Sequence, residues 1–342
     1  MARTVLHLVG SPIDGVHAEL SALYARGCLD VLLDRYDNRV AYVSPGGKWQ
    51  FPTSLAPAAL AEAQYLSAAE AVTCIESLDV SVVVPQMFCT PGMAAYRALF
   101  DVLGVPLIGN SAAVMSVAAD KAKTRAIVSA AGVAVPDGRV VRDATPTDLP
   151  LPVVVKPVGA DNSDGVSLVR DMDGYEAAVN EAMAHSSAAL VESYVELGRE
   201  VRCGIVVRDG ELMCLPLEEY AVDSVTKPVR DAADKLARRD DGELFLVAKD
   251  AARAWIVDVD DPITERVWVA ARRCHEALGC RYYSLFDFRI DPDGNPWFLE
   301  AGLYCSFAPT SVIAVMAAAV GISVEQLFAD ALAETDRETS RA

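Results

Sequence analysis

The 342-residue chain lacks the features that mark secreted, membrane and zinc-binding proteins. Its eight cysteines include no CxxC pair, and its four histidines form no compact ligand set, so neither a disulfide framework nor a zinc site is expected. The amino-terminal apolar run is too short for a signal peptide, and the longest later run, residues 312–320, is too short to span a membrane. These absences predict a cytoplasmic protein with reduced thiols.

Two widespread nucleotide-binding motifs are missing as well. Gly10 and Gly15 have the spacing of a P-loop, but Val16 and His17 follow where that motif needs Lys and Ser or Thr. No GxGxxG follows the first predicted strand. A Walker-type NTPase or a dinucleotide dehydrogenase therefore has weak support.

Positive charge is scarce. The chain has 30 Lys and Arg against 48 Asp and Glu, which gives a net charge of −18. A surface this acidic repels nucleic acid and anionic lipid, so neither is an expected partner. An anionic ligand would need a local cluster of Lys, Arg and backbone N–H donors.

The order of predicted elements indicates a mixed α/β and α+β protein with three lobes. Strands alternate with helices over residues 1–112, which predicts a parallel, Rossmann-like lobe. Residues 113–196 predict a small α+β lobe, and 197–335 a second one. Within the last lobe, residues 221–262 form a long charged connection of the kind that more often serves as a lid than as filler. Residues 336–342 are polar and predict a frayed tail.

A candidate phosphate site begins at Lys156. This lysine closes a predicted buried strand and precedes a loop, residues 157–165, that is rich in Pro, Gly, Asp, Asn and Ser. Such a loop can wrap backbone N–H groups around phosphate oxygens, and the lysine adds a point charge. A plain β-hairpin with a polar turn and a snorkelling lysine explains the stretch equally well.

The segment from Glu192 to Val195 ends a predicted strand and joins two lobes, and Glu200 lies eight positions beyond Glu192. Free backbone groups in such a hinge could read an adenine edge, and a carboxylate could accept from a ribose hydroxyl. Locally, an ordinary exposed connector is the simpler interpretation.

Two carboxylates are expected to face each other near the C-terminus. Asp287 lies inside one apolar strand and Glu300 ends the next, and the Asp-Pro-Asp-Gly turn at 291–294 pairs these strands as a hairpin. Two buried carboxylates repel unless a cation or protons neutralise them. Oxygen ligands suit Mg²⁺, which usually takes one or two protein carboxylates and adds phosphate and water. The alternative is that one of the two points to solvent.

Taken together, these residues resemble the D-alanine–D-alanine ligase branch of the ATP-grasp fold. The likeness runs in order along nearly the whole chain, through residues 40–49, 103–111, 120–121, 132–136, 151–157, 191–192, 278–280, 287, 293–294, 298–301 and 311. Each piece is weak alone, but the ordered set at family-like spacing is specific.

The resemblance implies a role for each site residue, with ATP and Mg²⁺ (or Mn²⁺) as cofactors. Lys121 and Lys156 would hold phosphates, under a loop that includes Gly159, Asn162, Ser163 and Gly165. Glu192, with the backbone of Ser193 and Val195, would take the adenine, Glu200 the ribose, and Asp287 and Glu300 the metal. Lys235 would reach the transferred phosphate, as Ser163 would from the loop, and the substrate site would use His17, Tyr304, Ser306 and Ser311.

The implied reaction is ATP-dependent joining of a carboxylic acid to an amine. Positioned cations neutralise charge as the γ-phosphate moves to the acid, an amine then attacks the acyl phosphate, and lid closure excludes water. A homodimer is expected because the family is commonly dimeric.

Several departures from the family pattern collect where substrates bind. His17 stands where the family has a Glu that pairs with an amino group, and Leu285 where it has an Arg that supports an oxyanion. Gly302 replaces an Asn of the metal site. We hypothesise that Arg289, or failing that Arg281, supplies the missing charge.

The segments 86–89 and 303–308 also depart from the family pattern, because they are bulkier and more aromatic. With the nucleotide half kept and the amino-acid half rewritten, the sequence favours a ligase for other substrates, such as those of a specialised biosynthetic pathway. Two alternatives stay open: a D-alanine–D-alanine ligase with altered residues, and a non-catalytic ATP-binding protein.

Overall fold

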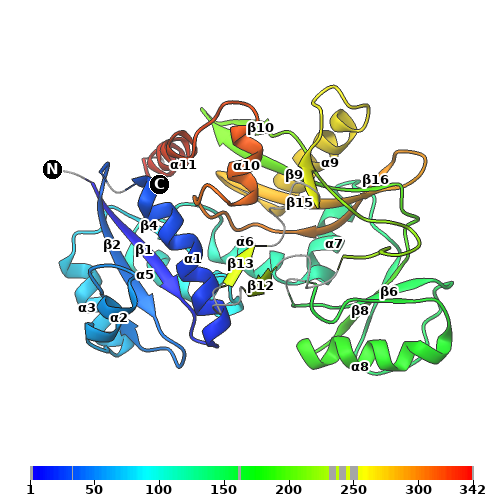
Figure 1. Cartoon of the computed structure of the whole chain (residues 1–342), viewed down its shortest axis with the longest axis horizontal. Helices are drawn as coiled ribbons and strands as arrows, with labels where there is room; N and C mark the ends of the chain where they lie inside the picture. Colours follow the sequence, from blue (N-terminus) through cyan, green and yellow to red (C-terminus); the bar gives the residue numbers. More distant parts are fainter. Residues whose placement is uncertain are drawn as a thin grey trace.

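The computed structural model describes residues 3–32, 34–160, 163–230, 236–238, 244–246 and 253–340. These residues form two four-stranded sheets, one six-stranded sheet and a two-stranded ribbon, each of the three larger sheets with its own helices (Figure 1). Among the described helices, none is both long and apolar enough to cross a membrane.

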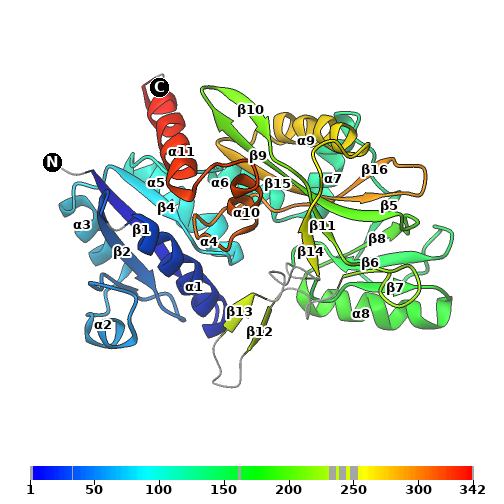
Figure 2. The same cartoon turned by 45° about the horizontal axis from the view of Figure 1, so that its top comes forward.

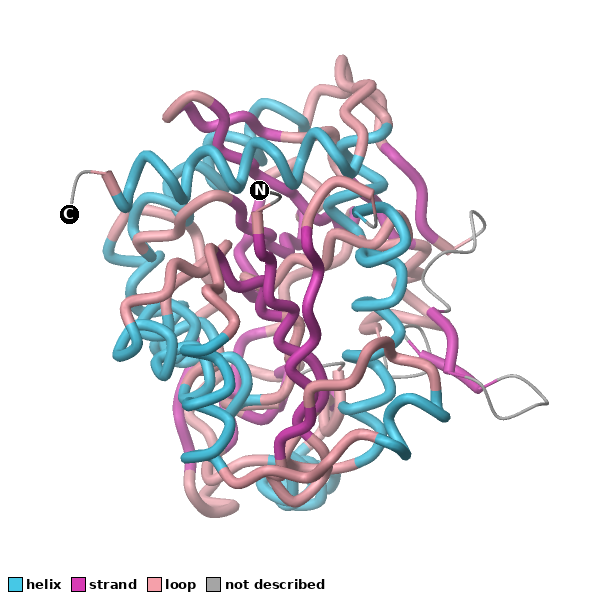
Figure 3. Tube along the Cα trace, turned by 90° about the vertical axis from the view of Figure 1, so that its left-hand side faces the viewer, coloured by secondary structure: helices cyan, strands magenta, loops and turns pink. Residues whose placement is uncertain are grey.

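The N-terminal sheet has the strand order β3-β2-β1-β4. Its strands are β1 (Thr4–Gly10), β2 (Asp37–Val43), β3 (Trp49–Gln50) and β4 (Val82–Pro85), and its helices are α1 (Gly15–Leu32), α2 (Pro57–Glu62), α3 (Ala68–Ser77), α4 (Thr90–Met93) and α5 (Ala95–Leu103). Strand β1 is parallel to both β2 and β4. Alternate residues of β1 face α1 on one side and α3 and α5 on the other, so helices lie on both sides of these strands (Figure 3). Burial on both faces explains why parallel strands give nearly continuous apolar runs in the sequence.

The central sheet has the order β5-β8-β6-β7. Its strands are β5 (Gly138–Val141), β6 (Val153–Pro157), β7 (Ser167–Val169) and β8 (Ala189–Ser193). Helices α6 (Ala112–Ala118) and α7 (Lys121–Ala130) precede these strands in the chain, and the short 3-10 turn η1 (Met172–Gly174) and α8 (Tyr175–His185) lie between β7 and β8. Because side chains alternate along a strand, Val153 and Val155 pack against α8, whereas Val154 and Lys156 face the other way.

The C-terminal sheet has the order β14-β11-β9-β15-β16, with β10 also paired to β9. Its strands are β9 (Arg199–Arg208), β10 (Glu211–Cys214), β11 (Glu218–Tyr220), β14 (Ala254–Ile256), β15 (Tyr283–Ile290) and β16 (Pro296–Ala301), and its helices are α9 (Thr264–Leu278), α10 (Val312–Ala318) and α11 (Val324–Thr339). The ribbon β12 (Leu236–Arg238) and β13 (Leu244–Leu246) lies beside α1 (Figure 2).

The first and last lobes share one core. Val5 and Val82 of the N-terminal sheet belong to the same apolar cluster as Leu285, Phe307 and Phe328 of the C-terminal lobe. A buried amide reinforces the contact, because Asn110 Nδ2 donates to the carbonyl oxygens of Tyr283 (3.0 Å) and Leu303 (2.9 Å). Such satisfied buried hydrogen bonds fix the relative position of the two lobes.

Two segments differ from the sequence-based expectation. The region 221–262 was expected to be irregular, but its end forms β14, which pairs with β11 and extends the sheet. Helix α11 runs to Thr339, so residues 336–339 are not the frayed tail that their polarity suggested. Ion pairs account for this, since Asp336 binds Arg3 and Glu338 binds Arg281.

Candidate active site

The strands of the C-terminal sheet place a row of charged residues on one face. Arg202 lies opposite Asp287 in the β9–β15 register, Glu200 lies opposite Arg289, and Asp287 lies opposite Glu300 in the β15–β16 register. Directly opposed residues of antiparallel strands point to the same face. The other face carries apolar residues that pack with α9, among them Val201, Cys203, Phe286 and Phe288.

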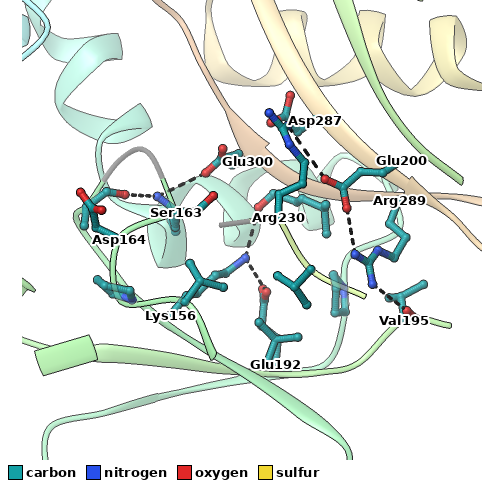
Figure 4. A pocket seen from close by; sticks show the side chains of 18 of the residues that line it. Lys156, Ser163, Asp164, Glu192, Val195, Glu200, Arg230, Asp287, Arg289 and Glu300 are labelled. Carbon is teal, nitrogen blue, oxygen red and sulfur yellow. Dashed lines mark hydrogen bonds and ion pairs between the residues drawn. The ribbon is translucent and has the colours of Figure 1, made fainter. Parts of the chain in front are cut away.

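The charged face and the outward face of the central sheet line one cavity. Lys156 and Glu192 reach it from the central sheet, and Asp287 and Glu300 from the C-terminal sheet (Figure 4). Helix α7 adds Lys121, its first residue, because α7 packs against β16. Residues far apart in the sequence thus meet around one space, as the sequence predicted for a nucleotide site.

Each carboxylate named above is paired with a cation of the protein. Lys156 Nζ lies 2.6 Å from Glu192 Oε2, and Arg125 lies 3.3 Å from the same carboxylate. Lys121 Nζ lies 3.4 Å from Glu300 Oε2. The Lys156–Glu192 pair is buried and therefore costly to break from one side, because the remaining charge stays out of water.

Asp287 is held at both of its oxygens by one guanidinium. Arg202 Nε donates to Oδ1, and Arg202 Nη2 donates to Oδ2 at 2.6 Å. Burial has the largest single effect and lowers the pKa of Arg202, but the charge and hydrogen bonds of Asp287, with Tyr220 and Glu218 nearby, together raise this pKa more, so its net shift is upward.

Arg289, the hypothesised replacement for the missing family arginine, lines the cavity, and its role there stays a prediction. Its Nη2 donates to Glu200 Oε2 and to the Pro228 carbonyl, each at 2.8 Å, and its Nη1 donates to the Val195 carbonyl at 3.3 Å. These contacts hold Arg289 at the hinge end of the cavity. They also engage Glu200, the residue predicted to bind the ribose.

Arg281, the second choice for that charge, lies elsewhere. Its side chain donates to the Gly109 carbonyl at 2.8 Å and pairs with Glu338 at 2.6 Å. Residue 281 precedes β15, and its side chain contacts the N-terminal lobe and α11 instead of the cavity.

Arg230 is a site residue that sequence reasoning missed. It lines the cavity, with its guanidinium carbon 3.6 Å from the centre of the Tyr220 ring and Nη1 4.0 Å from Glu200 Oε1. Figure 4 shows its guanidinium directed toward Glu200. It belongs to the long charged connection, where nothing in the sequence separates it from its many charged neighbours.

The loop predicted to cover phosphates adjoins the cavity. Ala160, Ser163 and Asp164 line the space, and Lys121 Nζ donates to the Ala160 carbonyl. Gly159 N donates to Ser186 Oγ at 3.2 Å, and Gly165 has a positive φ of 69°. Asn162 lies outside the described residues, as does Lys235.

The residues expected to contact the substrates do not reach this cavity. His17 is paired with Asp14 at 2.8 Å, and Ser311 is the N-cap of α10. The buried Ser306 Oγ accepts from Ala308 N, whereas the Tyr304 ring lies 5.4 Å from that of Phe88. The described lining of the cavity contains none of these four predicted residues. Their roles stay predictions.

Asp287 and Glu300 fit a divalent cation that bridges to phosphates. They are adjacent in register, line one cavity and offer hard oxygen donors beside Lys121 and Lys156. No group of three or more His, Cys, Asp or Glu side chains in the described part of the chain could hold a metal alone. Phosphate oxygens would therefore have to complete the coordination, which is usual for Mg²⁺.

The arrangement of two α+β lobes that clamp a charged cavity defines an ATP-grasp protein. The family model described as D-ala D-ala ligase C-terminus matches residues 135–333. The D-alanine–D-alanine ligase of Gluconobacter oxydans (strain 621H) is 32% identical over 239 residues, which cover 68% of this chain and 73% of that relative. The chain belongs to the D-alanine–D-alanine ligase family.

Further relatives and solved structures agree with this placement. The D-alanine–D-alanine ligase of Citrifermentans bemidjiense is 28% identical over 68% of this chain and 70% of its own length. The VanG D-Ala:D-Ser ligase from Enterococcus faecalis has a TM-score of 0.79 at 20% identity, covering 98% of this chain and 100% of that one. The D-alanine–D-alanine ligase from Bacillus anthracis complexed with ATP has a TM-score of 0.72 at 17% identity, covering 99% of each chain.

Membership in this family defines the class of reaction. The chain is an ADP-forming ligase that makes carbon–nitrogen bonds, and its family depends on ATP and a divalent metal. Small molecules of the amino-acid type are the substrates of such ligases.

Proposed function

We propose that the protein is an ATP- and Mg²⁺-dependent carboxylate–amine ligase that acts on a pair other than two D-alanines, in a specialised biosynthetic pathway. The observation that carries the ligase activity is the meeting of Lys121, Lys156, Asp287 and Glu300 around one cavity. A homodimer and lobe boundaries near residues 112 and 196 belong to the same proposal.

The cavity suggests how the residues share the work. Lys121 and Lys156 would turn from their carboxylate partners to phosphate oxygens, and Asp287 and Glu300 would hold the metal, which supplies positive charge to the same phosphates. The γ-phosphate moves to the acid carboxylate with loss of ADP, and the amine then displaces phosphate to form the amide. Closure of residues 157–165 would keep water from the acyl phosphate.

The substrate proposal is supported by what surrounds the departures from the family pattern. Leu285 packs in an apolar core with Met316 and Phe307, so its position offers no donor to an oxyanion. Phe88 contacts both Tyr24 and Tyr304, with ring centres 5.2 and 5.4 Å apart. An aromatic cluster between the first and last lobes suits a larger, less polar acid than alanine.

A phosphate-release screen with ATP and Mg²⁺ tests the function. We expect turnover with some combination of acids and amines, and none with D-alanine alone. Phosphate release that needs only D-alanine would overturn the substrate proposal and establish the alternative that the curated relatives' names suggest. ATP binding without ADP formation for every pair would instead indicate a binding protein.

The control for the screen removes the metal ligands together. The double variant Asp287→Asn/Glu300→Gln keeps the size of both side chains but weakens their hold on a divalent ion. We expect its rate of phosphate release to fall by a factor on the order of 100 or more, as is typical when charge stabilisation of a transition state is removed.

A further inference from the structure

We propose that Arg202 is an exchangeable counter-ion of the metal site. In this inference, which rests on the proposed function, Arg202 neutralises Asp287 until a divalent cation binds, and then turns to the terminal phosphate of the nucleotide. Arg202 is thus a positioning residue for the metal and a ligand of the phosphate.

The first step of the argument is competition for the same two oxygens. Arg202 engages Oδ1 and Oδ2 of Asp287 at once, and Asp287 is only 6% exposed. The guanidinium takes one lone pair of each oxygen and repels a second cation at the same carboxylate. Metal binding at Asp287 therefore competes with Arg202 and is favoured when the guanidinium swings away.

The second step is the balance of charge. Asp287 and Glu300 carry two negative charges, and Arg202 and Lys121 neutralise them. A divalent cation would supply the same two positive charges, so Arg202 and Lys121 would no longer be needed to neutralise the two carboxylates. A released guanidinium with a side chain 16% exposed needs a new anion, and the phosphate that arrives with the metal provides one.

The third step is the position of Arg202 between Asp287, which lines the cavity, and the aromatic cluster of Tyr24, Phe88 and Tyr304. Its guanidinium carbon lies 5.5 Å from the centre of the Tyr220 ring, which offers a cation–π surface along its path. Arg202 is also close enough to influence Tyr24, which contacts Phe88.

The arginines that line the cavity, Arg230 and Arg289, contact other groups than Arg202 does. Arg289 is tied to Glu200 and to two backbone carbonyls at the hinge. Arg230 is stacked on Tyr220 and is 4.0 Å from Glu200. Neither is paired with a predicted metal ligand, so a metal that binds to Asp287 and Glu300 would not displace either arginine directly.

The test compares three variants on the full chain without substrates. Arg202→Met removes the charge, Arg202→Lys keeps it, and Arg199→Met is the matched control. Arg199 lies on the same strand and also binds two carboxylates, Glu219 at 2.5 Å and Asp261 at 2.8 Å, but neither of them is a predicted metal ligand. Circular dichroism confirms that each variant is folded, and Arg202→Lys serves for both readouts if Arg202→Met is not.

The first readout is the affinity for Mn²⁺, measured from free Mn²⁺ by electron paramagnetic resonance in the presence of ADP. We expect Arg202→Met to bind Mn²⁺ on the order of tenfold more tightly than the wild type, because the competitor for Asp287 is gone. Arg202→Lys should bind Mn²⁺ with intermediate affinity, because one ammonium cannot occupy both oxygens. Arg199→Met should not differ from the wild type.

The second readout is the preference for a β,γ-imido analogue of ATP over ADP, each with Mn²⁺. We expect Arg202→Met to lose this preference by about tenfold, because its contact with the terminal phosphate is missing. Mn²⁺ affinity that is unchanged or weaker in Arg202→Met, or an unchanged preference for the analogue, would overturn the exchange. A wild type that binds no Mn²⁺ with either nucleotide would instead remove the proposed function itself.

Discussion

At the scale of single residues, Lys156 has two roles that can be separated. It lies 2.6 Å from Glu192, and the side chains of the pair are only 8% and 5% exposed. We expect Lys156→Met to lower the free energy of unfolding by about 3 kcal/mol, because it leaves a buried carboxylate that Arg125 only partly neutralises. The same variant should bind ATP at least tenfold more weakly. Urea unfolding and nucleotide titration measure the two effects.

Two further variants distinguish these roles. Lys156→Met/Glu192→Gln removes both charges, so it should recover most of the stability but none of the ATP affinity. Lys123→Met removes an exposed lysine paired with Asp120 on the same helix and should change neither quantity noticeably. A double variant as unstable as the single one would contradict the assignment of the buried pair.

The charged residues also show what a sequence can reveal at this scale. The hairpin that carries Asp287 and Glu300 was predictable from its turn, but their pairing depends on a β-bulge. The register at the turn would set Asp287 opposite Leu299, and the shift between Asp287 and Phe288 sets it opposite Glu300 instead. The partners of these carboxylates were not predictable. Arg202 meets Asp287 across 85 residues of sequence, and only the pairing of β9 with β15 brings the two together.

At the scale of elements, the loop after β6 depends on a glycine at its end. Gly165 has a φ of +69°, and a Cβ there would lie 2.9 Å from His185 Cδ2 and 3.0 Å from Pro157 Cγ. We expect Gly165→Ala to lower stability by about 1–2 kcal/mol from backbone strain. It should also weaken ATP binding several-fold, because the contact with His185 shifts the loop.

Gly210→Ala is the matched control for this prediction. Gly210 has a φ of +80°, but a Cβ at that position meets nothing within 4 Å. This variant should share the loss of stability from strain and leave ATP affinity unchanged. Thermal unfolding and nucleotide titration compare the two, and equal ATP affinity in both variants would show that the loop does not cover the nucleotide.

Helices and strands were predictable from the sequence where a single pattern, such as a continuous apolar run, determined the element. The run Val153–Lys156 predicted a buried strand that ends in a lysine, and the structure confirms that strand as part of β6. The pattern could not show that Val154 and Lys156 face the cavity, because a covering lobe is a tertiary feature. For the same reason β14 was missed, since three residues pair only because β11 is already in place.

At the scale of the whole molecule, stability depends on groups remote from the cavity. His7 is fully buried, between Asn38 at 2.8 Å and Gln86 at 3.0 Å, and burial lowers its pKa to about 4. His275 is buried beside Ser284 at 2.7 Å, and burial lowers its pKa to about 4 as well. Both imidazoles are therefore neutral in the folded protein at pH values where the unfolded chain already binds protons.

This difference predicts the loss of stability in acid. Above about pH 6.5, where both states are neutral, the two histidines have no effect on the pH dependence. As the pH falls from 6.5 to about 4, the unfolded chain takes up protons that the folded protein refuses, and each histidine lowers the free energy of unfolding by up to about 3 kcal/mol. Urea unfolding at a series of pH values between 7 and 4 measures the slope.

Removing one imidazole at a time identifies the source of this slope. His7→Gln keeps a neutral polar side chain between Asn38 and Gln86, so it should lose stability at neutral pH yet show roughly half of the acid-dependent decline. His185→Gln is the control, because His185 is more exposed and should leave the slope unchanged. An identical slope in His7→Gln and the wild type would show that the pKa of His7 is the same in both states, and would place the acid sensitivity of the molecule in His275 and the carboxylates instead.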